Sequence, residues 1–183
     1  MVLTSGQSGL AEPGFPLPFT RVGPFCAEGA GVNFVSYSVE TKAGPELAWD
    51  VYADWKLWQG YSDAFGEMHW TSGEPLQKGS RLDIEILHPV HTHVQRVILV
   101  CVPGKRLAWI DHTLGTTFEQ WLYFEPMANG GTRVHTWAEF TGILSVVAGQ
   151  PLKRVVLGFM ETWMGNYCAE CDRRVGKAAG ATS

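Results

Sequence analysis

The strongest constraint on the fold is a row of short alternating segments between residues 67 and 141. Apolar and polar residues alternate within each segment, and brief turns such as 103–105 (Pro-Gly-Lys) and 127–131 (Met-Ala-Asn-Gly-Gly) separate them. Alternation with a period of two is typical of strands that bury one face. Connections this short join antiparallel neighbours. The sequence therefore predicts an antiparallel sheet built from consecutive hairpins.

The segments on either side of this row predict one further strand and three helices. Residues 32–41 alternate like the later strands, whereas residues 43–65 change to helical spacing with Pro45 at a first helical position and Gly60 as a break. From about 145 to 174, apolar residues fall at steps of three or four, which indicates one long amphipathic helix. The predicted fold is α+β: a curved antiparallel sheet of six or seven strands wrapped around a long C-terminal helix, with two short helices after the first strand.

The chain divides by composition into an arm, one domain and a tail. Residues 1–30 are rich in Gly, Pro and Ser without any period, which is typical of an extended arm. Residues 31–176 carry the predicted elements, and 177–183 form a flexible tail. A length of 183 residues with 45% apolar residues is enough for one domain with a real core.

Charge and apolar patterning exclude several kinds of partner. The net charge is -4 and no stripe of Lys or Arg is present, so we expect no nucleic-acid partner. No apolar run approaches the roughly 18 residues of a membrane span, and the first residues lack the pattern of a secretory signal. These features favour a cytoplasmic protein.

Four cysteines, at 26, 101, 168 and 171, are too sparse for a disulfide framework, so free thiols are expected. Cys168 and Cys171 form a Cys-x-x-Cys pair near the predicted end of the long helix. Redox pairs of this kind usually lie where a helix begins after a strand. We therefore expect two half-buried thiols without a redox or metal role.

Four stretches of the chain resemble the SRPBCC superfamily of START / Bet v 1-like helix-grip proteins, and especially its polyketide cyclase/dehydrase-like branch. They are VETKAGPELAWDVYADWKLW (39–58), PLQKGSRL (75–82), VPGKRLAW (102–109) and LYFEPMANGGTRVHTWAEFTGIL (122–144), in a likeness that covers residues 33–174. The resemblance implies a deep hydrophobic pocket between the sheet and the terminal helix. Members bind lipids, sterols, plant hormones or polyketides, and some cyclise or dehydrate polyketides. The family has no fixed catalytic motif, so no catalytic residue is carried over.

We expect the pocket to be an internal cavity, because one helix cannot fill the concave side of so curved a sheet. Period-two alternation assigns the lining on the strands, and helical spacing assigns it on the helices. The expected ligand-binding residues are Trp70, Trp109, Phe118, Gln120, Thr136 and Phe140 on the sheet, Met160, Trp163 and Tyr167 on the long helix, and Trp55, Trp58 and Tyr61 at the mouth.

Polar residues on the inward face are the candidates for catalysis. Asp111 is the first acid/base candidate, because a carboxyl group desolvated in such a pocket can exchange a proton near neutral pH. The alternative places Asp111 at a strand end in water. Tyr37 is a candidate hydrogen-bond donor to a ligand carbonyl, or a core residue whose hydroxyl is bonded to the backbone. His112 and His135 fall on the opposite face, and a register shift of one residue would make them the acid/base pair instead.

Three histidines, His88, His91 and His93, lie within six positions. Glu85, His88 and His93 have a spacing similar to the iron triad of ring-hydroxylating oxygenases, which share this superfamily. The chain lacks the Cys/His pattern of the partner iron–sulfur cluster, and the spacing crosses a predicted hairpin. We expect a solvated hairpin tip or pocket rim and no metal.

The sequence thus predicts an enzyme of the cyclase/dehydratase type, active in secondary metabolism on a small hydrophobic or aromatic molecule. Pocket shape and general acid/base groups would suffice, without a metal or nucleotide cofactor. A non-catalytic carrier or sensor for a lipid or similar ligand is the alternative. A third reading is an interaction module that uses the outer sheet face. Trp121 and Trp137, predicted on that convex face, mark a candidate homodimer patch.

Overall fold

The computed structural model describes residues 34–113 and 115–180. The predicted N-terminal arm and Cys26 lie outside these residues. In chain order the elements are β1 (Phe34–Thr41), α1 (Pro45–Ala53), the 3-10 helix η1 (Trp55–Leu57), α2 (Trp58–Tyr61), β2 (Phe65–Ser72), β3 (Arg81–Ile86), β4 (Thr92–Val102), β5 (Arg106–Thr113), β6 (Thr116–Pro126), β7 (Thr132–Gly142), α3 (Ile143–Val147) and α4 (Gly149–Gly180).

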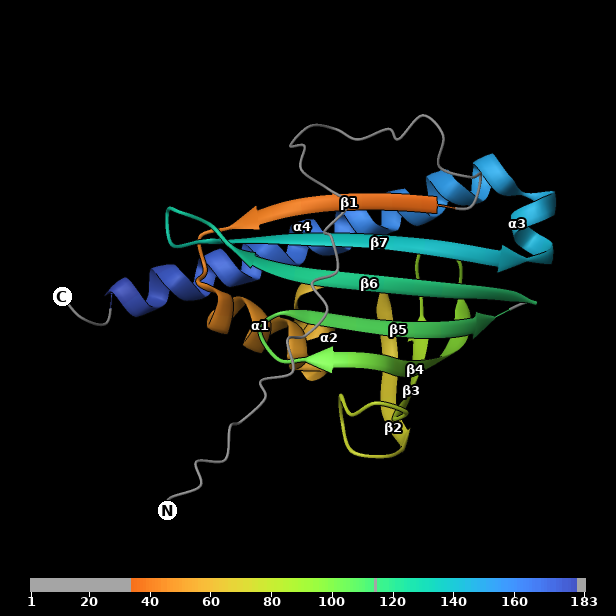
Figure 1. Ribbon diagram of the computed structural model, residues 1–183, viewed down its shortest axis with the longest axis horizontal. Helices are drawn as coiled ribbons and strands as arrows, with labels where there is room; N and C mark the ends of the chain where they lie inside the picture. Colours follow the sequence, from red (N-terminus) through yellow and green to blue (C-terminus); the bar gives the residue numbers. More distant parts are fainter. Residues whose placement is uncertain (1–33, 114, 181–183) are drawn as a thin grey trace, which may run out of the picture.

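The strands form a seven-stranded sheet in the order β1-β7-β6-β5-β4-β3-β2, and every neighbouring pair is antiparallel. Strands β2 to β7 follow one another as hairpins, and β1 joins at the edge beside β7. The sheet is strongly bent, so that β2 and β3 run across the direction of β5, β6 and β7, and α4 lies behind the sheet (Figure 1). This arrangement confirms the predicted helix-grip fold.

Period-two alternation correctly predicted which face of the sheet is buried. On β5, Leu107, Trp109 and Asp111 are all buried. On β7 the buried residues also alternate, and they are Thr132, Val134, Thr136, Ala138 and Phe140. α4 packs mainly along β1 and also contacts α1 and α2. No helix of residues 34–113 and 115–180 is both long and apolar enough to cross a membrane.

The long C-terminal helix differs from the prediction at both ends. A break at residue 148 separates α3 from α4, and Pro151 lies in the first turn of α4. Proline has no backbone N–H and clashes with the carbonyl four residues earlier, so a continuous helix is disfavoured there. At the other end α4 extends to Gly180, beyond the last apolar step. Lys177 and its alanine neighbours favour helix through propensity, without any apolar face.

The buried residues form two apolar clusters on the inner face. The larger contains most of the aromatic side chains, among them Tyr52, Trp109 and Trp163. The smaller consists of Val35, Ala138, Phe140 and Met160. Tyr37 contacts both clusters.

Candidate functional site

A buried ion pair lies on the inner face of the sheet, where β4 and β5 run side by side. Arg96 and Asp111 are cross-strand partners, with relative exposures of 3% and 4%. Arg96 Nε donates to Asp111 Oδ1 at 3.0 Å, and Nη2 donates to Oδ2 at 2.8 Å. Bidentate pairs of this kind are among the strongest hydrogen bonds in proteins. Asp111 therefore points inward and is paired, and does not lie in water at a strand end.

Aromatic rings surround the guanidinium group of Arg96. Its central carbon lies 4.2 Å from the centre of the Trp109 ring and 5.9 Å from that of Trp58. These distances are within the range of cation–π attraction. Tyr52 stacks against Trp109 with ring centres 6.3 Å apart, and it lies 5.7 Å from Trp163. The positive charge of Arg96 is thus stabilised by the Asp111 carboxylate and by the faces of the Trp109 and Trp58 rings.

Several polar atoms in this interior have no hydrogen-bond partner among the described residues. They include Arg96 Nη1, the Tyr52 hydroxyl and Trp109 Nε1. A buried polar group without a partner costs about 1–3 kcal/mol, and such groups are rare in folded proteins. Burial raises the pKa of Tyr52 well above its ordinary value, and nearby Arg96 only partly offsets this rise. Each of the three groups carries an N–H or O–H that can donate to an oxygen acceptor.

A second polar pair lies one strand further along the same face. Gln120 pairs in register with Trp109 on one side and with Ala138 on the other. Its Nε2 donates to Thr136 Oγ1 at 2.8 Å, and both side chains are buried. Tyr37 is the register partner of Thr136 on β1 and is half-buried. These polar groups lie between the two apolar clusters.

The centre of the grip is closed by aromatic rings. Tyr52, Trp58, Phe65 and Trp163 pack with ring centres between 5.1 and 5.7 Å apart. Among the described residues, one hollow lies beside residues 75–78, where Trp49 and Cys101 also line it, and another lies on the outer sheet face. These rings are large and fill the space between the sheet and α4 at this level, and the predicted internal cavity stays a prediction.

The interior is partly exposed near the first half of α4, which is called the open end below. Inward-facing Tyr37 and Phe118 on the sheet, and Val156 and Phe159 on α4, are all only partly buried. Phe118 is the cross-strand partner of Asp111. The buried ion pair thus lies one strand away from the open end of the grip.

The other predicted lining residues divide between this interior and the surface. Phe140, Met160, Trp163 and Tyr167 are buried on the inner side, and the Tyr167 hydroxyl donates to the Ala48 carbonyl at 2.7 Å. Trp58 is buried in the centre, which corrects its predicted place at the mouth, because its indole donates to the Tyr52 carbonyl at 2.9 Å. The remaining predicted lining residues, Trp55, Tyr61 and Trp70, are half-buried.

The histidines on β5 and β7 lie on the outer face, away from Asp111. His112 is exposed and bonds to Thr117 Oγ1 at 3.1 Å. His135 is half-buried and bonds to Ser38 Oγ at 2.7 Å. The register shift that would bring them inward does not occur. Burial lowers the pKa of His135, and Glu125 opposes this shift.

The outer face also carries a row of stacked aromatic rings. Trp121 and Trp137 are cross-strand partners with ring centres 5.8 Å apart, and Phe34 and Tyr123 extend the stack at either end. The convex position predicted for both tryptophans is therefore correct. The homodimer patch inferred from them stays a prediction.

The cysteine pair on α4 is in the thiol form. Cys168 and Cys171 are both free. Burial raises the pKa of Cys168 to about 12 and that of Cys171 to about 11. Because the thiolate is the nucleophile and the metal ligand, this direction of the pKa disfavours reactivity of either thiol, and the absence of a redox role stays a prediction.

Sequence reasoning missed Arg96 and Tyr52. Arg96 is in phase with Val94 and Ile98, so the alternation on β4 already placed a charge on the buried face. Tyr52 lies within a stretch of α1 whose buried residues include Trp49 and Val51. Neither signal shows which partner the side chain has, since that depends on the pairing of β4 with β5.

The fold and the buried polar interior place the chain among helix-grip proteins. Residues 34–179 match the family described as polyketide cyclase / dehydrase and lipid transport, and the chain belongs to this family. No protein of curated function matches the chain by sequence.

Solved structures share the fold at low sequence identity. Zhui, an aromatase/cyclase from Streptomyces, aligns with a TM-score of 0.67 and 13% identity over 78% of this chain and 94% of its own. A START superfamily protein from Mycobacterium smegmatis aligns with a TM-score of 0.67 and 12% identity, over 77% of this chain and 98% of its own. Norcoclaurine synthase from Thalictrum aligns with a TM-score of 0.61 and 14% identity, over 77% and 94% of the two chains.

Proposed function

We propose that the protein binds a small hydrophobic or aromatic molecule with a carbonyl oxygen between the sheet and α4, and acts on it as a cyclase/dehydratase-type enzyme without a cofactor. The observation that carries this proposal is three buried donors that have no partner within residues 34–113 and 115–180, namely Arg96 Nη1, Trp109 Nε1 and the Tyr52 hydroxyl. Membership of the family and the likeness to an aromatase/cyclase support it.

The chemistry follows from the charge of this donor set. Aldol-type ring closure and water loss both develop negative charge on a carbonyl oxygen, as an enolate or alkoxide. Prearranged donors in a desolvated site stabilise such charge strongly. Arg96 would supply the positive charge, and Tyr52 and Trp109 would supply neutral hydrogen bonds. In this proposal Asp111 is a positioning residue, because both of its oxygens are already bonded to Arg96.

Entry of the ligand would use the half-exposed end of the grip, between the first half of α4 and strands β1 and β6. Phe118, Phe159 and Val156 provide an apolar wall there. Tyr37, half-buried at the same end, is the group placed to exchange a proton between ligand and water. Part of the aromatic packing would have to move aside for a ligand to reach Arg96.

The test compares binding and turnover in Tyr52→Phe and Tyr123→Phe. Tyr123 lies on the outer face and serves as the control. Binding is followed by quenching of tryptophan fluorescence with a hydroxylated anthraquinone, and turnover by cyclisation of a synthetic aromatic triketone. We expect the wild type and Tyr123→Phe to accelerate cyclisation and Tyr52→Phe to be at least about tenfold slower. If the wild type leaves the spontaneous rate and product ratio unchanged, the enzyme proposal fails.

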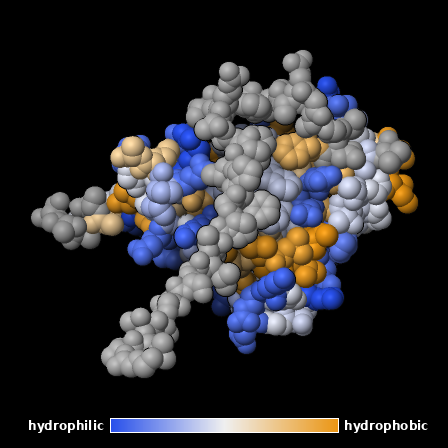
Figure 2. Space-filling model, viewed as in Figure 1, coloured by the Kyte–Doolittle hydropathy of each residue, from blue (hydrophilic) through white to orange (hydrophobic). Residues whose placement is uncertain are grey.

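A carrier of lipids is the second candidate, and apolar residues exposed near the open end favour it. Ile143, Val147 and Val155 on α3 and the start of α4 are 68%, 79% and 41% exposed. Apolar side chains are visible at the surface at the end of the molecule where α3 lies (Figure 2). A carrier would use them to contact a membrane while it collects its ligand.

Transfer of a fluorescent fatty acid between vesicles tests the carrier. We expect Ile143→Ser combined with Val147→Ser to slow transfer several-fold. Val90→Ser is the matched control, because Val90 is 57% exposed on the β3–β4 loop. Tyr37→Phe should keep its ligand affinity whether the protein is a carrier or an enzyme. If the protein is an enzyme, the same variant should also lose cyclisation rate. Equal transfer by all the variants would exclude a role for this surface.

A further inference from the structure

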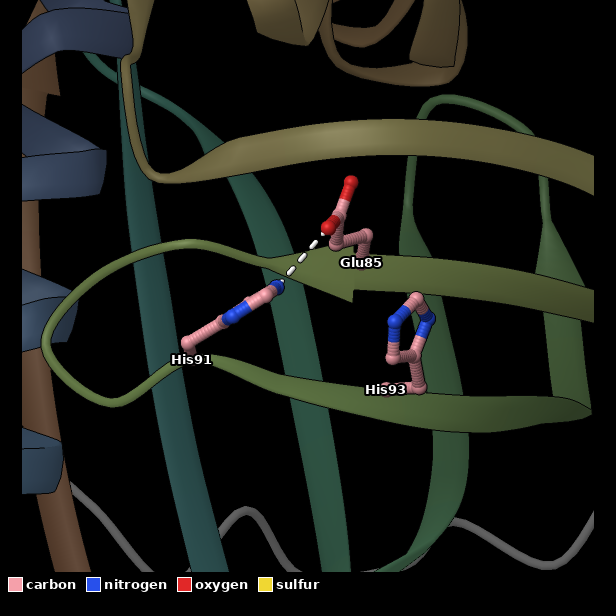
Figure 3. Close-up of side chains that lie close together, drawn as sticks. All are labelled: Glu85, His91 and His93. Carbon is pink, nitrogen blue, oxygen red and sulfur yellow. Dashed lines mark hydrogen bonds and ion pairs between the residues drawn. The ribbon is translucent and has the colours of Figure 1, made fainter.

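Three potential metal ligands meet at the hairpin that joins β3 to β4, on the outer face of the sheet. One ligand atom from each of Glu85, His91 and His93 lies within 4.8 Å of the other two. In Figure 3 the side chains approach one another from the end of β3, from the loop and from the start of β4. His88, which the sequence spacing had grouped with Glu85 and His93, is exposed and lies outside this cluster.

The strand pairing explains why these residues converge. Glu85 and His93 are directly opposite each other in the β3–β4 register. His91 lies in the loop directly before β4, and its Nε2 is 2.8 Å from Glu85 Oε1. The centres of the two rings are 5.9 Å apart. The register of the sheet therefore fixes the approach of Glu85 and His93, and His91 joins them from the loop through its contact with Glu85.

Glu85 is already held in the orientation of a ligand. Its Oε1 is 2.8 Å from His91 Nε2, and its Oε2 accepts a hydrogen bond from the Glu67 backbone N–H at 3.1 Å. The hydrogen bond with His91, followed by that with Glu67, lowers the pKa of Glu85. A side chain at Gly66 would collide with this carboxylate, so the glycine provides its space.

The surroundings favour a cation. A hollow of about 330 Å³ lies beside the cluster on the outer face of the sheet. Carboxylates and imidazoles dominate its lining, which includes Glu67, His69, Asp83, Glu85, His93 and His112. Three carboxylates without a lysine or arginine among these lining residues make the hollow electronegative, which raises the local concentration of divalent cations.

We propose that Glu85, His91 and His93 bind a divalent transition-metal ion of the Zn²⁺ type. Two imidazoles and one carboxylate suit zinc, whereas Mg²⁺ and Ca²⁺ prefer oxygen ligands throughout. Zinc bonds of about 2.0–2.2 Å in tetrahedral geometry place two ligand atoms about 3.5 Å apart, so rotation of the exposed His93 side chain toward Glu85 and His91 would close the site. The ion would replace the His91–Glu85 hydrogen bond and join β3, the loop and β4.

The metal would keep positions open to water, because the His91 side chain is 64% exposed. This site lies on the opposite face of the sheet from Arg96 and Asp111. It is therefore independent of the ligand proposed for the interior. It also changes the interpretation of the histidine-rich hairpin, which the sequence alone suggested to be a metal-free tip.

Calorimetric titration of the full, untagged chain with ZnCl₂ tests the site. We expect one Zn²⁺ per chain and a loss of affinity of at least about tenfold in His93→Gln. His88→Gln, on the same loop and outside the cluster, should bind as the wild type does. Absence of binding at millimolar Zn²⁺, or equal binding by His93→Gln and the wild type, would overturn the proposal.

Thermal unfolding provides an independent readout, since a ligand that binds only the folded chain raises its melting temperature. Excess Zn²⁺ should raise the Tm of the wild type and of His88→Gln, and should leave that of His93→Gln nearly unchanged. Because His93 is exposed on the sheet surface, this variant should fold normally without metal. A similar zinc-dependent rise in all three proteins would contradict the assigned ligands.

Discussion

Arg96 and Asp111 face each other across β4 and β5 and share two hydrogen bonds, of 3.0 and 2.8 Å, inside the apolar interior. Removing two charges from water is costly, and their mutual attraction repays this cost only when the geometry is good. Within the part of the chain that the structure describes, one guanidinium nitrogen nevertheless has no hydrogen-bond partner. The two charges therefore neutralise each other, while Arg96 Nη1 is left as the donor that the proposed ligand would use.

Breaking this pair from one side should be strongly destabilising. Asp111→Ala leaves the Arg96 charge buried and uncompensated, so we expect the free energy of unfolding to fall by about 3–5 kcal/mol. Urea denaturation followed by circular dichroism measures this loss. In the double variant Arg96→Met with Asp111→Leu, most of the loss should be recovered. Losses that simply add in the double variant would show that the two side chains are not coupled.

The Tyr52 hydroxyl should contribute little to stability. It is buried and has no partner among the described residues, so Tyr52→Phe removes an unsatisfied group and should leave the free energy of unfolding unchanged or slightly higher. Tyr167→Phe is the matched comparison, because the Tyr167 hydroxyl donates to the Ala48 carbonyl. That variant should lose about 1–3 kcal/mol, since the carbonyl is left without its partner. Equal losses in both variants would indicate that Tyr52 has a structural partner.

His135 should make stability depend on pH in the mildly acidic range. Burial lowers its pKa in the folded chain below the ordinary value of 6.5. Between these two values the unfolded chain binds more protons than the folded chain, so stability is retained above pH 6.5 and falls as the pH decreases through this window. Denaturation curves at several pH values should show a shallower decline in His135→Gln. Parallel declines would rule out this source of acid sensitivity.

The stacked tryptophans on the outer face should be energetically coupled. Trp121 and Trp137 are nearly parallel, with an angle of 14° between their rings. Aromatic pairs contribute about 0.5–1.5 kcal/mol beyond the area that they bury. A double-mutant cycle with Trp121→Ala and Trp137→Ala should yield a coupling energy of this size. Additive effects would show that the two rings lie together without stabilising each other.

The fold could be predicted from the sequence because strand alternation and short turns are patterns of neighbouring residues. The two-residue period on β5 and β7 identified Trp109, Asp111 and Thr136 as inward-facing. Short turns forced each strand to pair with the next. The break before α4 was missed because the apolar spacing continues across Pro151, whose effect on the backbone outweighs that spacing.

The site was less predictable because it depends on contacts between elements. A charge at position 96 was visible on an apolar strand face, but its pairing with Asp111 requires the β4–β5 register, which is offset by an irregularity between Ile98 and Val100. The closure of the interior likewise depends on how rings from α1, α2, β5 and α4 fit together. No local pattern contains that information.

The position of β1 bears on how the chain acquires its structure during synthesis. This first strand of the domain pairs with β7 and lies under α4, the last two major elements to be made. Until the ribosome has released them, β1 has no neighbour and its apolar side is open to other chains. Contacts between such distant parts of a chain also form slowly. A chain truncated before β7 should therefore leave β1 without its partner strand and be prone to aggregation, whereas one truncated before α4 can pair β1 but leaves its apolar side uncovered.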